Sequence, residues 1–430
     1  MNKLFLLLIL FVMMQTTKSQ SAESDTVWSK SIGSEVLQVK FSPDGELVYV
    51  GAANFKPFVV STATGETIRE FEQSFVSVTA MDLSKDGKYL AVAGGGGRKA
   101  SLIDVSTGNV MTEYIIPNEI SEKFGFRVIY SASISYDVKY FAIVLRGDNT
   151  ISENEGYVLI WEVLSGKFVK SIQKNYANRA IFSPTENIIA VCTNEEDADN
   201  NISVYNTETW KNAHQFCCHS NLIQDITFSP DSSLLASGGW DGVIKIWDVE
   251  QKKLVKEIKE EQIQIYSVCF INKDFILSDG GDFWNHYVVV RNLTIPSVTG
   301  QIRTSLQRDI DVYQQKSLAI IALGNGLLLY DFHDAITSVN EMSHNNENST
   351  ISPNPTNNGS EINFFLPISG KTLVSIADAN AREIEVLHKG FLDEGEHKFL
   401  WLPKNVASGT YFCRISGTNF SKTLKIILEK

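Results

Sequence analysis

Cysteine is scarce in this sequence, which has five in 430 residues, at positions 192, 217, 218, 269 and 413. A set so small and so scattered excludes the disulfide framework that holds many small secreted domains together. Cys192 and Cys269 lie in apolar strand patterns, and we expect both to be buried like small hydrophobic residues. The adjacent Cys217 and Cys218 could form a strained vicinal disulfide outside the cytoplasm, but two ordinary thiols are the expectation.

Long apolar runs are also missing beyond the first residues. The run from Leu4 to Met14 follows Lys3 and precedes the polar stretch TTKSQ. It is too short to span a bilayer, and this order is typical of a signal peptide, with cleavage predicted near Ser19. Residues 1–19 are therefore predicted to be removed on export, and no later segment is long enough for a transmembrane helix.

Dense basic clusters are the third absence. The formal net charge is −12 at pH 7, and no stripe of Lys and Arg interrupts the acidic balance. This argues against nucleic acid as a partner. The glycine run at 94–97 has no P-loop lysine after it, so phosphate binding is not predicted there either.

A repeated five-residue turn element organises the first three quarters of the chain. Its copies FSPDG, LSKDG, ISYDV, FSPTE and FSPDS begin at residues 41, 83, 134, 182 and 228, and weaker copies begin at residues 270 and 312. An apolar strand precedes each turn, and a later strand recurs in step, as in VLIWEVLSG and IKIWDVEQ. Seven units of about 44 residues, each with several short strands, predict a repeat architecture of small sheets.

This pattern resembles the WD-repeat β-propeller, most clearly in the fifth unit, which contains the pair Trp247-Asp248. The resemblance implies an all-β ring of seven four-stranded blades over residues 26–334. In such proteins a leading strand completes the last blade, and the stretch TVWSKSI at 26–32 stands where that strand would be. Closure of this kind hides a sheet edge that would otherwise pair with another chain.

Four residues of the fifth unit match the hydrogen-bonded tetrad of WD repeats: His219, Ser237, Asp241 and Trp247. The first three are also the residue types of a hydrolase triad. A nucleophilic serine needs an exposed hydroxyl on a strained turn, whereas Ser237 lies within the strand pattern LLASGG. We therefore interpret the set as a structural tetrad in which buried polar groups satisfy one another, and we predict no catalytic residue.

Aromatic residues gather in the turns between the second and third strands of neighbouring units. Trp240 lies in this turn of the fifth unit, and Phe283, Trp284 and His286 lie in that of the sixth. With Arg98 of the second unit they form the predicted partner-binding face. The alternative is that these aromatic rings pack between blades.

Acidic turns are the remaining candidates within the ring. Asp197, Asp199 and Asn201 have part of the spacing of a calcium loop, but Ile202 stands where such a loop needs glycine. The acidic segment 147–156 is interpreted in the same way, as a solvated turn. No metal and no cofactor is predicted.

Beyond the ring, residues 335–350 have the Asn- and Ser-rich composition of a linker. Strand patterns from EINFFL to TLKIIL then predict a small Ig-like β-sandwich of six or seven strands over residues 351–430. This segment resembles the C-terminal sorting domain of bacterial type IX (Por) secretion, through Pro353-Asn354-Pro355 and, near the end, Gly409-Thr410-Tyr411. The resemblance implies recognition by the outer-membrane secretion machinery. The alternative is an adhesive Ig-like domain that stays attached.

These features predict an exported, non-enzymatic propeller that passes through the periplasm and binds a protein or glycan at or outside the cell surface. One alternative is an extracellular propeller hydrolase or another metal-assisted enzyme, which requires several acids or histidines that converge on the ring axis. With His219 in the tetrad, only His214, His286 and His333 remain in the ring, and no pair of them has ligand spacing. A purely structural surface protein is a further alternative.

Overall fold

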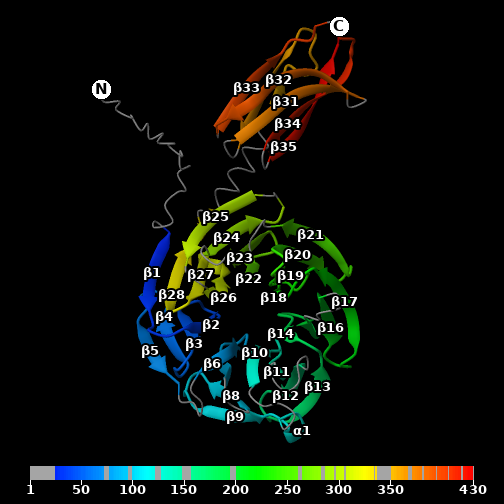
Figure 1. Cartoon of the computed structure of the whole chain (residues 1–430). Helices are drawn as coiled ribbons and strands as arrows, with labels where there is room; N and C mark the ends of the chain where they lie inside the picture. Colours follow the sequence, from blue (N-terminus) through cyan, green and yellow to red (C-terminus); the bar gives the residue numbers. More distant parts are fainter. Residues whose placement is uncertain are drawn as a thin grey trace, which may run out of the picture.

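The computed structural model describes residues 25–429 apart from short segments. The segments outside the description are 72–76, 95–98, 122–126, 148–155, 194–199, 260–263, 282–285, 295–296, 305–306, 334, 337–349, 367–369, 380–381, 394, 405 and 418–419. In the described residues, seven four-stranded sheets form a ring, and a three-stranded and a four-stranded sheet form a C-terminal sandwich (Figure 1). The predicted all-β class and the seven blades are confirmed.

Blades one to four each use four consecutive strands, from the ring axis outward. Blade one contains β2 (Val36–Phe41), β3 (Leu47–Ala52), β4 (Phe58–Ser61) and β5 (Thr67–Glu70). Blade two contains β6 (Val78–Leu83), β7 (Tyr89–Gly94), β8 (Lys99–Asp104) and β9 (Val110–Ile115), followed by the short helix α1 (Asn118–Ser121). Blade three contains β10 (Arg127–Ile134), β11 (Tyr140–Gly147), β12 (Gly156–Glu162) and β13 (Phe168–Gln173). Blade four contains β14 (Ala177–Phe182), β15 (Ile188–Thr193), β16 (Asn200–Asn206) and β17 (Asn212–His219).

Blades five and six repeat this order, and blade seven departs from it. Blade five contains β18 (Ile223–Phe228), β19 (Leu234–Gly239), β20 (Val243–Asp248) and β21 (Lys253–Lys259). Blade six contains β22 (Gln264–Phe270), β23 (Phe275–Gly281), β24 (His286–Asn292) and β25 (Ser297–Thr304). Blade seven contains β26 (Gln307–Tyr313), the 3₁₀ turn η1 (Gln314–Lys316), β27 (Leu318–Leu323), β28 (Gly326–Asp331) and, as its outer strand, β1 (Thr26–Ser31).

The leading strand closes the ring as predicted. β1 pairs antiparallel with β28, so residues from the two ends of the propeller share one sheet (Figure 1). The indole N–H of Trp28 donates to the carbonyl of Thr62 at 2.7 Å, and the Lys30 ammonium donates to the carbonyl of Gly65 at 2.7 Å. β1 therefore binds blade seven through its backbone and blade one through its side chains.

One hydrogen-bond pattern explains the sequence of the repeated turn element. In the first copy, Ser42 Oγ donates to Asp44 at 2.5 Å and accepts the N–H of Leu47 at 3.0 Å. The residue after the aspartate has a positive φ, which glycine adopts without strain, and Gly45 has φ 69°. The copies around Ser84, Ser135 and Ser229 make the same bonds. The turn thus needs Ser and Asp at fixed positions, which is why the sequence repeats them.

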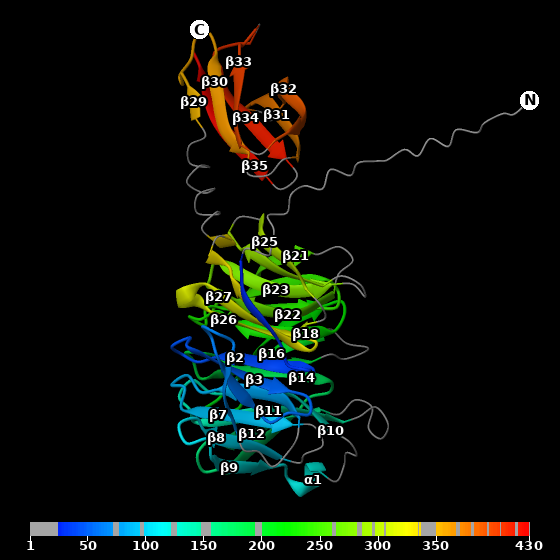
Figure 2. The ribbon, with the colours of Figure 1, turned by 90° about the vertical axis from the view of Figure 1, so that its left-hand side faces the viewer.

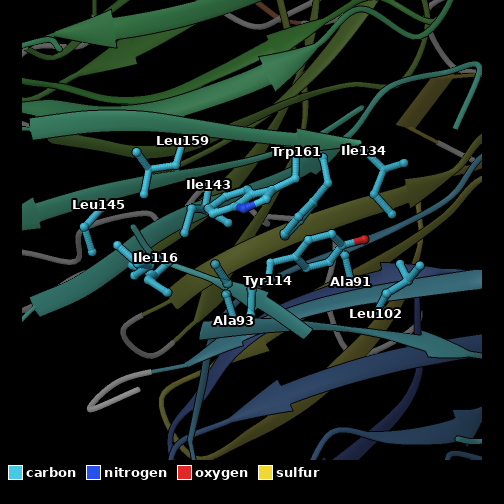
Figure 3. Close-up of a cluster of buried hydrophobic side chains, with 14 of the residues drawn as sticks. Ala91, Ala93, Leu102, Tyr114, Ile116, Ile134, Ile143, Leu145, Leu159 and Trp161 are labelled. Carbon is cyan, nitrogen blue, oxygen red and sulfur yellow. The ribbon is translucent and has the colours of Figure 1, made fainter. Parts of the chain in front are cut away.

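Hydrophobic clusters fill each junction between neighbouring blades. The cluster between blades two and three includes Leu102 and Tyr114 from one side and Leu159 and Trp161 from the other (Figure 3). The Tyr114 hydroxyl donates to the carbonyl of Val163 at 2.5 Å, so its one polar atom is paired inside the cluster. Six further clusters occupy the other junctions. A blade cannot bury its apolar faces alone, so the closed ring is the stable unit.

The C-terminal residues form a β-sandwich with its own core, which Figure 2 shows apart from the ring. One sheet has the order β29-β30-β33, and the other has the order β32-β31-β34-β35. The strands are β29 (Thr350–Ser352), β30 (Ser360–Leu366), β31 (Gly370–Asp378), β32 (Glu383–Leu392), β33 (Gly395–Trp401), β34 (Gly409–Gly417) and β35 (Phe420–Leu428). Seven strands agree with the predicted count.

Candidate functional site

The end of blade four and the fifth blade bring the four predicted tetrad residues together. His219 Nδ1 is 3.0 Å from both carboxylate oxygens of Asp241, and its Nε2 is 2.8 Å from Ser237 Oγ. The indole N–H of Trp247 donates to the same hydroxyl at 3.2 Å. If His219 donates from Nδ1 to the carboxylate, its Nε2 accepts from Ser237, whose oxygen remains free to accept from Trp247. Every polar group of the set then has a partner.

The side chains of this set are buried. Ser237 is 0% exposed and His219 is 3% exposed, so the hydroxyl does not reach solvent. Burial pushes the pKa of Asp241 upward, but hydrogen bonds from His219 and from the N–H groups of Ser220 and Val243 outweigh it and hold the pKa below its usual value. The carboxylate therefore stays ionised and fixes the turn that follows β19.

Blade six contains a variation on this arrangement. Arg291 occupies the position in β24 that corresponds to Trp247, and it is 4% exposed. Its Nη1 donates to Ser278 Oγ at 2.5 Å, and Ser278 corresponds to Ser237. A buried arginine thus makes the bond that the tryptophan makes in blade five.

Trp240 lies on an exposed turn that the tetrad anchors. Its side chain is 36% exposed, while its backbone N–H donates to the carbonyl of Leu222 at 2.9 Å. The next residue, Asp241, accepts hydrogen bonds from the N–H groups of Ser220 and Val243 at 2.9 and 3.1 Å. The indole is therefore presented to solvent from a backbone whose polar groups are already bonded.

Of the other residues predicted for this face, one is buried and three lie outside the residues that the structure describes. His286 is 8% exposed within β24, and its ring lies 5.6 Å from that of Tyr266, so its assignment to an exposed face is corrected. Phe283, Trp284 and Arg98 lie outside the described residues. Sequence reasoning missed Phe55, which is 39% exposed in the corresponding turn of blade one. Phe55 could have been predicted from its position between β3 and β4, which corresponds to the position of Trp240 between β19 and β20.

The ring axis holds a charged cavity that sequence reasoning also missed. The first strands of the blades are neighbours all around the ring (Figure 1), and they enclose about 330 Å³. Six charged side chains line the cavity below its rim: Lys40, Asp82, Arg179, Asp225, Asp309 and Asp311. Each lies one or three residues before the first residue of a turn element. Side chains two residues apart in a strand point to the same side, so charged residues at these positions of otherwise apolar strands could have predicted a charged axis.

Most of these charges bind the next blade. Asp309 and Asp311 accept the N–H groups of Val39 and Phe41 at 3.0 and 2.7 Å. Asp82 accepts the N–H of Ile134 at 2.8 Å. Arg179 Nε donates to Asp225 of the next blade at 2.8 Å, and its Nη2 is 3.7 Å from Asp309 across the channel.

The protonation equilibria reflect burial and an excess of carboxylates. Burial raises the pKa of Asp309 to about 6, and the attraction of Lys40 and Arg179 offsets it only in part. Burial likewise raises the pKa of Asp82, against the attraction of Lys40. For Lys40, burial acts to lower the pKa, but Asp311, Asp82 and Asp309 outweigh it and leave the pKa above its usual value. Lys40 therefore stays protonated among these acids, and 31% of its side-chain surface is exposed to solvent.

Metal binding has little support among the described residues. No group of three or more His, Cys, Asp or Glu in that part of the chain is arranged to hold a metal ion. Of the suggested calcium loop, Asp197 and Asp199 lie outside the description, and Asn201 accepts from the hydroxyl of Thr193 at 3.1 Å. The acidic segment 148–155 is also outside it.

The cysteines follow the expectation only in part. Cys192 is a buried free thiol and Cys269 is a half-buried one, and burial raises the pKa of both. Cys217 is disulfide-bonded, so the expectation of an ordinary thiol there was wrong. The side chain of Cys218 lies outside the described residues.

The Pro353-Asn354-Pro355 motif lies against the last strand of the sandwich. Asn354 Nδ2 donates to the carbonyl of Lys425 at 2.8 Å, and its Oδ1 accepts the N–H of Ile427 at 2.8 Å. Thr356 continues the pairing through its backbone with Ile427 and Glu429. The motif therefore occupies an edge of β35. On the other side of the same stretch of β35, Gly409 begins β34 opposite Leu428, and the hydroxyl of the mostly buried Tyr411 donates to the carbonyl of Ala407 at 2.7 Å.

Comparison with protein families matches two parts of the chain. Residues 210–248 match the WD domain, G-beta repeat family, and residues 350–429 match the secretion system C-terminal sorting domain. The first match contains the whole tetrad, and the second spans the sandwich. None of the helices that the structure describes has the length or the hydropathy needed to cross a bilayer.

Curated relatives resemble the propeller at low identity. Eukaryotic translation initiation factor 3 subunit I of Bombyx mori is 25% identical over 234 residues, which are 53% of this chain and 67% of that protein. WD repeat-containing protein 1 of Gallus gallus is 26% identical over 259 residues, which are 57% of this chain and 39% of that protein. The chain thus spans about two thirds of the first relative and about two fifths of the second.

A solved structure shares the fold. The β-propeller domain of Cps50 (Swd1) from Myceliophteria thermophila superposes with a TM-score of 0.58 at 13% identity. The superposition covers 71% of this chain and 99% of that domain. Because the identity is so low, the similarity supports the propeller fold and nothing about a shared activity.

Proposed function

We propose that this chain, a WD-repeat β-propeller with a C-terminal type IX secretion sorting domain, is exported and acts as a non-enzymatic binding scaffold at or outside the cell surface. Its partner is a protein or a glycan that binds the face formed by the turns between second and third strands. In this proposal the sorting domain engages the secretion machinery.

The anchored turn at Trp240 is the observation that carries the binding role. An exposed tryptophan offers a large apolar surface, and aromatic residues of this kind dominate many interfaces. The backbone around Trp240 is already bonded to Leu222, and Asp241 is bonded to Ser220. A partner therefore needs to order little of the protein when it binds, which favours affinity.

The tetrad supports a scaffold because its geometry lacks what catalysis needs. A nucleophile must meet its substrate, and Ser237 is closed off on all sides. In our proposal the set joins the end of blade four, at His219, to blade five. The curated relatives are named as a subunit of an initiation factor and as a WD-repeat protein, which also fits a role in binding.

The alternative function, a metal-assisted hydrolase, would use the four aspartates at the ring axis. These acids do converge, as a metal-assisted hydrolase would require, and a raised pKa is common in active sites. However, each binds a neighbouring backbone or an arginine, and no histidine is among the described residues that line the cavity. Stoichiometric calcium or zinc in the purified protein would favour this alternative over the scaffold.

The scaffold is tested with the full chain and three single variants. Immobilised wild type, Trp240→Ala and Phe55→Ala are exposed to surface-protein and surface-polysaccharide fractions of the producing cells, and bound material is quantified. Leu164→Ala is the matched control, because Leu164 is 58% exposed but lies in a turn on the opposite face. We expect Trp240→Ala to weaken capture roughly 10-fold or more and Leu164→Ala to leave it unchanged. Equal capture by Trp240→Ala and wild type would reject this face.

A further inference from the structure

The central cavity opens on the face opposite to Trp240. Strand direction alternates within a blade, so the turns after first strands lie at one face and the turns after second strands lie at the other. Lys85, Tyr136 and Pro184, from turns after first strands, line the mouth of the cavity. Lys85 reaches from blade two to blade four, where its ammonium donates to the carbonyl of Pro184 at 2.9 Å. A ligand that enters the cavity from this face therefore passes Lys85.

Below this mouth the lining has more negative than positive charge. Asp82, Asp225, Asp309 and Asp311 give four carboxylates, and Lys40 and Arg179 give two cations. With all six ionised, this part of the lining has a formal charge of −2, and Lys85 at the mouth adds one positive charge. Buried charges without counter-charges are costly, so the cavity favours a further positive group.

The deeper carboxylates both face Arg179. Asp225 receives Arg179 on one oxygen and Ser267 with the N–H of Val268 on the other, at 2.8 to 3.0 Å. Asp309 receives the N–H of Val39 on one oxygen and faces Arg179 with the other. These two acids are committed to holding the ring together.

The shallower carboxylates, Asp82 and Asp311, each bind the backbone of the next blade. Both use Oδ2 to accept the N–H groups of Ile134 and Phe41. The Asp82 carboxylate also accepts the N–H of Leu83, whereas Oδ1 of Asp311 is 4.0 Å from the Lys40 ammonium, which is beyond hydrogen-bond distance. An acceptor on Asp311 and a loosely paired lysine therefore face the cavity.

We propose that this cavity binds one organic cation, an ammonium or guanidinium group on a slim aliphatic chain, between Asp82 and Asp311. Asp311 offers its Oδ1 and Asp82 adds a second negative charge, and both groups carry several N–H donors that can bond two acceptors at once. The cation reduces the excess negative charge of this part of the lining from two to one. The group comes either from a free amine or from a Lys or Arg side chain of a partner.

The size of the cavity fits such a group. About 330 Å³ corresponds to roughly ten water molecules at about 30 Å³ each, which leaves room for a short aliphatic chain and bridging water. The raised pKa of Asp82 fits the same ligand, because burial and the nearby Asp311 disfavour the ionised form of its carboxyl despite the attraction of Lys40. A cation bound beside it lowers that pKa.

The test measures binding of defined cations to the full chain by calorimetry at low salt. The free probes are butylamine and agmatine, the peptide probes are capped Ala-Lys-Ala and Ala-Arg-Ala, and butanol is the uncharged control. We expect saturable binding of cations and none of butanol. Tighter binding of the peptides assigns the cation to a partner side chain, and tighter binding of the free amines assigns it to a small molecule. No binding of any cation overturns the proposal.

Three variants locate the site. Asp82→Asn keeps an acceptor for the N–H of Ile134 but removes the charge, and it is expected to weaken binding about 10-fold. Lys40→Met removes the competing cation and is expected to strengthen binding several-fold, whereas an anion site would be weakened. Glu70→Gln, which removes one exposed carboxylate at the outer edge of blade one, is the control and is expected to bind like wild type. Wild-type affinity in Asp82→Asn, or weaker affinity in Lys40→Met, also overturns the proposal.

This inference stands apart from the proposed scaffold. The cavity opens away from Trp240, so Trp240→Ala is expected to leave cation affinity unchanged. A failure to bind cations leaves the opposite face untouched, and a failure of partner capture leaves the cavity untouched.

Discussion

The carboxylate of Asp309, on the last blade, accepts the backbone N–H of Val39, on the first blade, at 3.0 Å. Asp311 repeats this contact with Phe41 two residues further along each strand, at 2.7 Å. The two ends of the propeller thus meet at the axis through carboxylates, while β1 joins them at the outer edge. The seam that closes the ring is fixed both at the inside and at the outside.

The first prediction concerns the pH dependence of this seam. The folded-state pKa of Asp309 is about 6, above the value of about 3.9 for an unfolded Asp, so folding favours the protonated acid. Its stabilising contribution is therefore complete below about pH 4 and is lost as the pH rises through about 6. Asp309→Asn does not titrate. We expect the stability of this variant relative to wild type to increase by roughly 2–3 kcal/mol from pH 4 to pH 7, measured by urea unfolding.

The control for this prediction has the opposite sign. Hydrogen bonds from Ser106 and Thr107 lower the pKa of Asp104, so the stability that wild type gains from this group builds up as the pH rises towards the unfolded pKa and is complete above it. Asp104→Asn is therefore expected to lose relative stability from pH 3 to pH 5. A stability difference for Asp309→Asn that does not vary with pH would show that the buried carboxyl is not titrating as described.

Local turn chemistry explains why most of the fold could be predicted from the sequence. Ser42, Asp44 and Gly45 make bonds that require those residue types, so the turn leaves a visible repeat. The alternating apolar strands between the turns then set the number of blades. Even the leading strand could be predicted, because an unpaired outer edge of β28 would otherwise remain.

The candidate sites could be predicted less well, because they depend on contacts between distant blades. Lys40 and Asp311 are far apart in sequence, and no motif links the two positions. The sequence therefore does not indicate that they meet at the axis. His286 was placed by its neighbours in an aromatic stretch, but the strand β24 begins at that residue and buries its ring. By contrast, the tetrad around His219 lies within one unit and its neighbour, and a motif captures it.

The second prediction concerns the tetrad. His219→Ala removes the partner of Asp241 and of Ser237 and leaves a buried carboxylate and a buried hydroxyl. We expect the free energy of unfolding to fall by about 3 kcal/mol, since one of the lost bonds involves a charged group. Thermal and urea unfolding measure this loss, and His333→Ala, which alters an exposed histidine, is the control. Unchanged stability in His219→Ala would contradict the structural role of the tetrad.

The third prediction concerns the outer closure. The indole N–H of Trp28 donates to the carbonyl of Thr62. The indole ring lies so close to Gly65 that a Cβ added to this glycine would be 3.1 Å from the ring. Trp28→Ala removes this bond and apolar contact between β1 and blade one, so we expect a loss of about 2–3 kcal/mol in urea unfolding. The neighbouring Val27 is 49% exposed, so Val27→Ala should cost well under 1 kcal/mol. Similar losses in the two variants would show that the indole contact is unimportant.

The last prediction concerns the edge of the sandwich. Asn354 bonds both the carbonyl of Lys425 and the N–H of Ile427, much as a neighbouring strand would, so it shields part of β35. In Asn354→Ala, we expect faster hydrogen exchange in residues 420–428 and a smaller exported fraction, because the edge that the sorting domain presents is altered. Asn357→Ala, an exposed asparagine of the same segment, is the matched control and should preserve both. If exchange rises but export is unchanged, the motif stabilises the sandwich without contributing to recognition, and if exchange stays at the wild-type rate, Asn354 does not hold this edge.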